Sequence, residues 1–381
     1  MPKPQADEVQ KMYSSTPNAD LLSLDGQHQL KQMEAVLRKH WRLGQNMVLC
    51  WAPDPRGLLT LVVPHFFLGN FSAADSNQSD SNEEFVREVI GGSRLKSHEQ
   101  IFSIAKRLGV STSFIKLDEP LGDDPALLKA ADAMISSYGI GFVESRGVIL
   151  FDIAEFSLYS PFEQASQLNS LSYSMNSAYN KLQREGVDVN FARTTTGDGY
   201  YVWNRDVGPY PDLDLLCFLL LVLIDNAVAR RQASGNTVPI IRSAFHIGSH
   251  YELCQAEGIN PTLFSYIVGD VTIKLARMLA VADAGQVMLG DFQAPLPELE
   301  GVYGPGRFVN AALQQLMELS HLQIAGESLK KMTLVQGSVG TERAMPHHIK
   351  DKHGMVQSAF NLCAKVDWGS EALTLGTPLS Q

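Results

Sequence analysis

The feature that most constrains the fold is an apolar run from Leu215 to Ile224, which reads LLCFLLLVLI. It is far shorter than the ~20 residues that a helix needs to span a bilayer. Acidic residues bracket it, because Asp212 and Asp214 precede the run and Asp225 follows it. These features predict a helix buried in a protein core, and we expect no membrane partner.

Composition places the chain among folded proteins. It has 381 residues, of which 45% are hydrophobic and 19% charged, so it can bury a sizeable core in one large or two smaller domains. The formal net charge of -10 gives no general attraction to nucleic acid. The start, MPKPQADEVQK, lacks the apolar segment of a signal peptide, and the four cysteines form no CxxC pair. We therefore expect a cytoplasmic protein that does not bind nucleic acid.

The first part of the chain, residues 1–140, carries no motif that indicates chemistry. Its periodicity predicts a helix over 27–42, a hairpin over 47–63, a polar loop over 73–83 and helices near 84–91, 97–108 and 125–138. We expect a mixed α/β extension of unknown role. A sensor, a dimerisation extension and an autoinhibitory segment all remain open.

The central part has a different order of elements. It reads as a strand over 147–153, a helix over 161–185, strands over 187–193 and 199–203, a helix over 213–231 and a strand over 238–247. This β-α-β-β-α-β order predicts an α+β fold of the ferredoxin-like, split βαβ type, mainly an antiparallel sheet with helices packed on it. Further elements are expected over 270–281, 286–289, 306–320 and 347–366, and a flexible tail over 369–381.

Two aspartates stand at expected strand ends. Asp152 ends the buried strand GVILFDI, and Asp198 lies in a Gly-Asp-Gly turn between two strands. Taken singly, each has an ordinary explanation as a helix cap or a turn residue. If the hairpin flanks the first strand, however, the two carboxylates come together and repel unless a cation joins them. Magnesium binds one or two carboxylates plus substrate phosphates, and paired metals can promote phosphoryl chemistry.

A third candidate is Arg277. Gly269-Asp270 opens a predicted helix, with Asp270 as its cap, and Arg277 follows two turns later. Its guanidinium could stabilise charge on phosphates, although a surface arginine is the simpler explanation.

In this order, these segments resemble the class III nucleotidyl cyclase domain. That family has an FxDIxGF strand, a TIGD hairpin, a GxxVNxAxR helix and a PGQI strand. The corresponding segments here are FDIAEF at 151–156, TTGD at 195–198, GDVTIKLAR at 269–277 and GQV at 285–287. In addition, IRSAFHIGSHYEL is similar to the family strand RxGIHxGxV. The resemblance extends from about residue 146 to residue 290.

The resemblance implies a cyclase domain over 141–368, a phosphorus–oxygen lyase that converts a nucleoside triphosphate into a 3′,5′-cyclic nucleotide and pyrophosphate. It implies two Mg²⁺ or Mn²⁺ ions per active site, held by Asp152, Asp198 and the carbonyl of Ile153. Arg277 would stabilise the transition state from the partner subunit, so a homodimer with composite sites is expected.

The resemblance also implies phosphate contacts. These would come from the backbone amides of Ala154, Glu155, Phe156 and Ser157 and from a late lysine, Lys352 or its neighbour Lys350. Two positions depart from the family pattern: Glu155 replaces a glycine, and Ile273 replaces an asparagine.

The base-selecting positions depart as well, since Thr194 and Tyr266 stand where purine cyclases place groups that recognise the base. Tyrosine is larger than the family's aspartate and would shrink the pocket. The pattern resembles pyrimidine cyclases of bacterial antiphage defence, which implies UTP, then CTP, as substrate and cyclic UMP as messenger. Arg193 should face away from the base, because neighbouring residues on a strand point to opposite faces. An adenylate or guanylate cyclase, and a degenerate cyclase-like protein that binds nucleotide or a partner without turnover, are the alternatives.

Overall fold

The computed structural model describes residues 22–73, 79–257, 260–351 and 354–377. Contacts divide the chain into two compact units, residues 1–143 with 251–267 and residues 144–250 with 268–381. The first boundary lies close to the expected one at residue 140, whereas residues 251–267 group with the N-terminal unit. The predicted α+β class is confirmed, because helices pack on largely antiparallel sheets.

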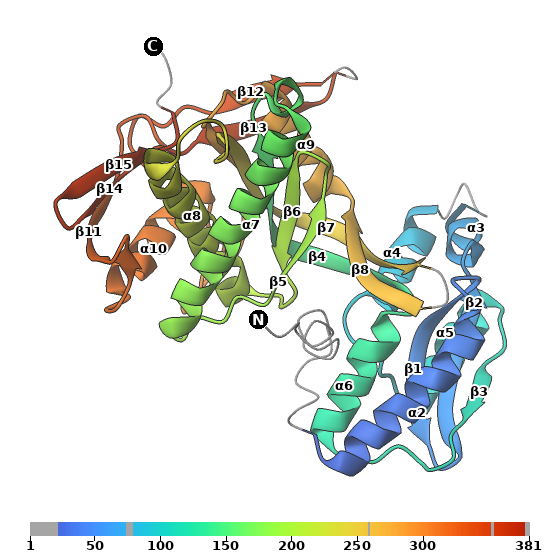
Figure 1. Cartoon of the computed structure of the whole chain (residues 1–381). Coiled ribbons are helices and arrows are strands. Elements are labelled where there is room, and N and C mark those ends of the chain that lie inside the picture. The colour runs from blue at the N-terminus through green and yellow to red at the C-terminus, as the bar shows by residue number, and fades with distance from the viewer. Residues whose placement is uncertain (1–21, 74–78, 258–259, 352–353, 378–381) are drawn as a thin grey trace. The chain divides into compact units, whose positions relative to one another are not determined.

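The first unit is a three-stranded antiparallel sheet with helices on both faces (Figure 1). One core joins the sheet to helices α2 and α6 and includes Trp51 and Ile115. The other joins it to α4 and α5 and includes Leu49 and Leu61. The elements are α2 (Leu24–Trp41), β1 (Asn46–Asp54), β2 (Gly57–Pro64), α3 (Phe67–Ala73), α4 (Ser79–Ile90), α5 (His98–Leu108), β3 (Ser113–Lys116) and α6 (Pro125–Ser136).

The second unit contains an eight-stranded sheet and a four-stranded sheet. Its elements, of which β4, β7 and β8 also carry residues of the first unit, are β4 (Ile140–Ile153), α7 (Pro161–Arg184), β5 (Phe191–Thr195), β6 (Gly199–Asn204), α8 (Pro209–Gln232), β7 (Ile241–Glu257), β8 (Asn260–Val268), α9 (Asp270–Val281), β9 (Val287–Gly290), α10 (Pro305–Glu318), β10 (Gln323–Ile324), β11 (Glu327–Leu334), β12 (His347–Lys350), β13 (Val356–Asn361), β14 (Ala364–Trp368) and β15 (Glu371–Leu375).

The large sheet has the strand order β12-β13-β9-β7-β4-β6-β5, and β8 pairs with β7. Its last four strands, β7-β4-β6-β5, are those of the predicted split βαβ unit. The fourth strand of that unit therefore lies beside the first, and the first lies beside the third, so the ferredoxin-like topology is confirmed.

The apolar run lies within α8, and every residue from Leu215 to Ile224 is buried. The prediction of a core helix is therefore confirmed. Helices α7 and α8 lie side by side (Figure 1) and share one core with β4. No helix in the described part of the chain is long and apolar enough to span a membrane.

The two faces of the sheet carry different residues. In β7, Phe245 and Ile247 belong to the core under α7 and α8, so His246 and Arg242 point to the opposite face. Helix α9 lies on that opposite face, where its Lys274 lines a pocket together with His246. By the same alternation, Phe151 faces α7 and α8, whereas Asp152 faces the α9 side.

Several elements differ from expectation. Strands β3, β8, β10 and β11 were not predicted, and α4 begins at Ser79 inside the expected polar loop. The expectation of a flexible tail from residue 369 is wrong for 371–375, which form β15 on the edge of the small sheet. Leu373 and Leu375 are buried there, and their burial holds this segment in place.

Candidate functional site

The predicted pair of aspartates comes together at the end of β4. Asp152 pairs with Gly199 across β4 and β6, and the amide of Ile153 donates to the carbonyl of Asp198 over 3.0 Å. The two acids are therefore neighbours in space although they lie 46 positions apart in sequence (198 minus 152).

Two glycines make this approach possible. A Cβ on Gly199 would lie 1.9 Å from the carbonyl oxygen of Phe151, so only glycine lets β6 pass this close to β4. Gly197 has φ 103°, a left-handed conformation that glycine adopts without strain. The turn is closed by the amide of Gly197 donating to Thr195 Oγ1 over 3.0 Å and by the hydroxyl of Thr196 donating to Asp198 Oδ1 over 3.3 Å.

The carboxylate of Asp152 is partly buried, with 14% of its side chain exposed. Burial raises its pKa above the ordinary value, the guanidinium of Arg242 opposes that rise, and the nearby charge of Asp198 adds to it. A cation would relieve both the desolvation and the repulsion. The two carboxylates and the carbonyl of Ile153 thus fit a divalent cation that completes its shell with phosphates and water.

Among the described residues, no group of three or more His, Cys, Asp or Glu side chains could hold a metal ion.

Sequence reasoning missed Arg242, which forms an ion pair with Asp152 through its Nε. It also donates from Nη1 to the carbonyl of Ala282 over 3.3 Å. The signal was present in IRSAFHIGSHYEL, whose single arginine is Arg242. Its contact with Asp152 depends on β7 lying beside β4, which local sequence does not reveal.

The proposed phosphate-binding amides follow Ile153. The amide of Ala154 already donates to the carbonyl of Ile240 over 2.9 Å, so it is engaged within the fold. Glu155 adopts φ 58°, the left-handed conformation in which the family's glycine would be unstrained. Phe156 and Ser157 open a short 3₁₀ turn, whose first amides have no partner within the turn itself. Lys352 lies outside the described residues, whereas Lys350 is exposed at the end of β12.

The proposed base-selecting residues lie in different units. Thr194 pairs with Tyr201 in the second unit, and the hydroxyl of Tyr201 donates to the carbonyl of Thr272 on α9 over 3.2 Å. Thr194 therefore faces the same side of the sheet as Asp152. Tyr266 is exposed on β8 and belongs to the first unit. Arg193 donates to Ser172 on α7 over 2.9 Å, which confirms that it faces the other side.

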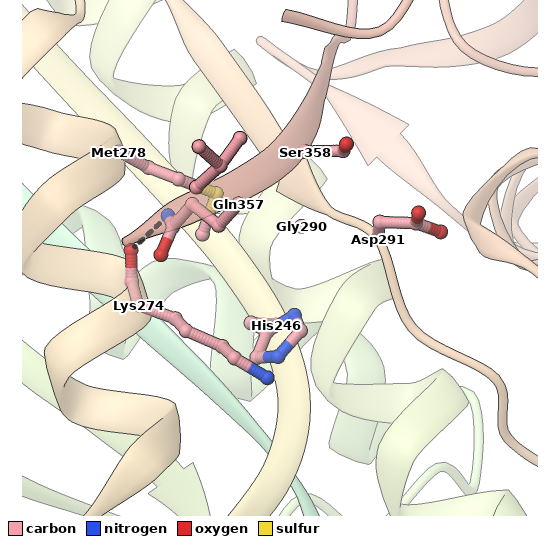
Figure 2. Close-up of a pocket in the computed structure, with 8 residues that line it drawn as sticks. His246, Lys274, Met278, Gly290, Asp291, Gln357 and Ser358 are labelled. Carbon is pink, nitrogen blue, oxygen red and sulfur yellow. Dashed lines mark hydrogen bonds between the residues drawn. The ribbon is translucent and has the colours of Figure 1, made fainter. Parts of the chain in front are cut away.

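Helix α9 carries Arg277, which forms an ion pair with Asp351 at 2.5 Å. Ile273, on the same helix, is 51% exposed. Beneath α9 lies a pocket of about 190 Å³ (Figure 2), lined by His246, Lys274, Met278, Gly290, Asp291, Val356, Gln357 and Ser358. Burial, followed by the charge of Lys274, lowers the pKa of His246 to about 4, so this imidazole is neutral at pH 7.

No family model matches the sequence, and no curated protein is significantly similar to it. Several solved structures are similar. The guanylate cyclase domain of RhGC from Catenaria anguillulae is 15% identical with a TM-score of 0.35, and the match covers 58% of this chain and 97% of that one. The guanylyl cyclase Cya2 is 11% identical with a TM-score of 0.36, covering 57% and 91%. The adenylyl cyclase CyaB from P. aeruginosa is 9% identical with a TM-score of 0.34, covering 58% and 95%. Similarity at this level assigns neither a substrate nor a mechanism.

Proposed function

We propose that the protein is a nucleotide cyclase that converts a nucleoside triphosphate into a 3′,5′-cyclic nucleotide and pyrophosphate. The observation that carries this proposal is the approach of Asp152 and Asp198 at the end of β4, where Arg242 pairs with Asp152 and a divalent cation would offset the repulsion between the two carboxylates. The order of the family-like motifs along the chain supports the same activity.

In this proposal the ribose 3′-oxygen bonds to the α-phosphorus, the bond to the pyrophosphate oxygen breaks, and the hydroxyl proton passes to solvent. Two Mg²⁺ or Mn²⁺ ions would lower the pKa of the attacking hydroxyl and stabilise the leaving pyrophosphate. Asp152 and Asp198 would hold the ions, together with the carbonyl of Ile153. Arg242 pairs with Asp152, and its guanidinium has further donors for phosphate oxygens.

We also propose a homodimer whose sites combine Asp152 of one subunit with Arg277 of the other. Ile273 supports this, because a half-exposed isoleucine on the helix that carries Arg277 suits an interface. A mixture of Asp152→Asn and Arg277→Ala proteins should regain activity, since mixed dimers contain one intact site. Absence of recovery, with subunit exchange demonstrated, would contradict the composite site.

For the base we propose a pyrimidine, UTP before CTP. Thr194 faces the same side of the sheet as Asp152 and offers a hydroxyl rather than a charge. Size alone discriminates by only ~10–200-fold per small group, so strong selectivity requires hydrogen bonds as well. The resemblance alone implies Tyr266 as a second base-recognising residue, and Tyr266→Ala, which should admit purines, tests that implication.

The test is to incubate the protein with each of the four ribonucleoside triphosphates and Mn²⁺ and to identify the product. Cyclic UMP as the dominant product supports the proposal. Cyclic AMP or cyclic GMP would overturn the base assignment but retain the cyclase. No product from any triphosphate, with binding still measurable, would favour a degenerate nucleotide-binding protein. The proposed defence role rests on the resemblance alone, and measuring the cyclic nucleotide in phage-challenged cells tests it.

A further inference from the structure

Asp351, which directly follows β12, holds the side chain of Arg277. Arg277 Nη2 lies 2.5 Å from Asp351 Oδ2, and the two side chains are 28% and 10% exposed. Asp351 follows β12 directly, and sequence analysis had given it no role. The proposed catalytic arginine is thus paired with a more deeply buried carboxylate on a different element.

Asp351 is itself anchored by hydrogen bonds to Gly354 and Met355. Its Oδ1 accepts from the amide of Met355 over 2.9 Å, and its own amide donates to the carbonyl of Met355 over 3.0 Å. Its carbonyl accepts from the amide of Gly354 over 3.0 Å. One carboxylate oxygen therefore accepts from the amide of Met355, while the other contacts Arg277. An anchor of this kind suits a fixed support better than a latch that opens.

A second contact docks α9 on the same hairpin. Gln357 Nε2, on β13, donates to the carbonyl of Lys274 over 2.9 Å, as the dashed line in Figure 2 shows. Lys274 lies one turn before Arg277, so the helix backbone is held close to the place where the arginine side chain is held.

We infer that Asp351 is a positioning residue that fixes the guanidinium of Arg277 for phosphate contact, an inference that rests on the proposed function. A long arginine side chain samples many rotamers when it is unrestrained. A carboxylate on one edge of the guanidinium selects one orientation and leaves the other donors for the substrate. Misplacement of such a group by about 1 Å can cost ~100-fold in rate.

Asp351→Asn is the selective variant. The asparagine oxygen can still accept from Met355, so the turn is kept, whereas its amide nitrogen cannot pair with a guanidinium. We expect kcat to fall about 10–100-fold while KM for the triphosphate stays within about threefold, because orientation rather than binding is lost. Asp283→Asn is the matched control, since it removes an exposed carboxylate just beyond α9 and should leave kcat unchanged.

The decisive comparison is a double-mutant cycle. If Asp351 acts through Arg277, then Asp351→Asn should reduce kcat no further in an Arg277→Ala background. Melting temperatures should be measured for the wild type, the two single variants and the double variant. The changes in melting temperature of the two single variants should not add up to that of the double variant, and this reports on the ion pair without requiring activity.

The outcomes separate two failures. A fully additive loss of kcat, or normal kcat in Asp351→Asn with an active wild type, overturns the positioning role alone. A rise in kcat in Asp351→Asn overturns it in favour of an inhibitory restraint. Inactivity of the wild type towards all four triphosphates overturns the proposed function and the positioning role with it, whereas the melting cycle still reports whether the pair forms.

Discussion

Three aspartates of the second unit have a raised pKa, and two of them, Asp152 and Asp212, have opposite surroundings. Asp152 lies at the end of β4, partly open to solvent, beside Asp198 and Arg242. Asp212, in the first turn of α8, is 3% exposed. Its Oδ1 accepts a hydrogen bond over 2.6 Å from the amide of Gly147, which lies on β4, the strand that also carries Asp152. Burial raises the pKa of Asp212 to about 7.

Their partners explain the difference. Near Asp212 lies the buried Arg146, which contacts His250 Nε2 at 3.2 Å and donates to the carbonyl of Arg205 over 2.9 Å. The side chains of Asp212, Arg146 and His250 are all buried, with exposures of 3%, 3% and 1%. The Asp152 site has a second carboxylate and remains accessible. A raised pKa therefore identifies a candidate site only where the group can be reached.

The largest expected effect concerns turnover. Asp152→Asn or Asp198→Asn should reduce it by about 10²–10⁴-fold, because each variant removes one anionic ligand of the metal pair and several kcal/mol of transition-state stabilisation. The melting curve should change little, since neither acid supports the core. Pyrophosphate release and thermal unfolding measure the two quantities.

Asp212→Asn is the matched control and should retain turnover, because Asp212 lies away from the β4 end. If Asp152→Asn, Asp198→Asn and Asp212→Asn all lost turnover equally, the proposed difference between the accessible Asp152 and the buried Asp212 would be wrong.

The second effect concerns stability and pH. The pKa of Asp212 is higher in the folded than in the unfolded chain, so its contribution is fully present below about pH 4. It is lost as pH rises through about 7. Relative to Asp212→Asn, the free energy of unfolding of the wild type should therefore fall by a few kcal/mol between about pH 4 and pH 8. Denaturant unfolding at several pH values measures this difference.

His250 titrates in the opposite sense, since burial and Arg146 lower its pKa to about 4. Its contribution is present above its unfolded pKa and is lost as pH falls towards 4. His250 remains in both proteins, so its effect largely cancels in the difference. If the difference in free energy of unfolding between the wild type and Asp212→Asn stayed constant from about pH 4 to pH 8, the raised pKa of the buried Asp212 would be contradicted.

The smallest effect concerns the turn at Gly197 and Gly199, which brings Asp152 and Asp198 together. Gly199→Ala forces a Cβ against the carbonyl of Phe151 and should lower the free energy of unfolding by about 1–3 kcal/mol. The same variant should also lose turnover. Gly197→Ala meets open space but strains a left-handed residue, so it should cost about 1 kcal/mol and keep more activity. Similar stability and turnover for the two variants would show that the close approach of β6 does not set the site.

Local sequence was sufficient for the parts of the site that depend on local structure. Asp152 at a strand end and Asp198 in a Gly-Asp-Gly turn were both placed correctly, because periodicity and turn chemistry specify them. The order of the central elements then led to the correct sheet topology. The alternation along β5 also placed Arg193 correctly, on the α7 side.

Contacts between distant strands and turns were missed. Arg242 meets Asp152 only because β7 lies beside β4, and Asp351 meets Arg277 only because the β12–β13 hairpin lies beside α9. Strand β15 was missed although Leu373 and Leu375 alternate with polar residues, because its sequence is short. The amide of Ala154 was proposed for phosphate, but its hydrogen bond to the carbonyl of Ile240, just before β7, was not visible in the sequence.

The most direct test of the central claim is a titration of Mn²⁺ by electron paramagnetic resonance, with a non-hydrolysable UTP analogue present. The wild type and Asp212→Asn should each bind two Mn²⁺ per site, whereas Asp152→Asn and Asp198→Asn should bind at least about tenfold more weakly. Retention of wild-type Mn²⁺ binding by Asp152→Asn and Asp198→Asn would contradict the assignment of this carboxylate pair as the metal site.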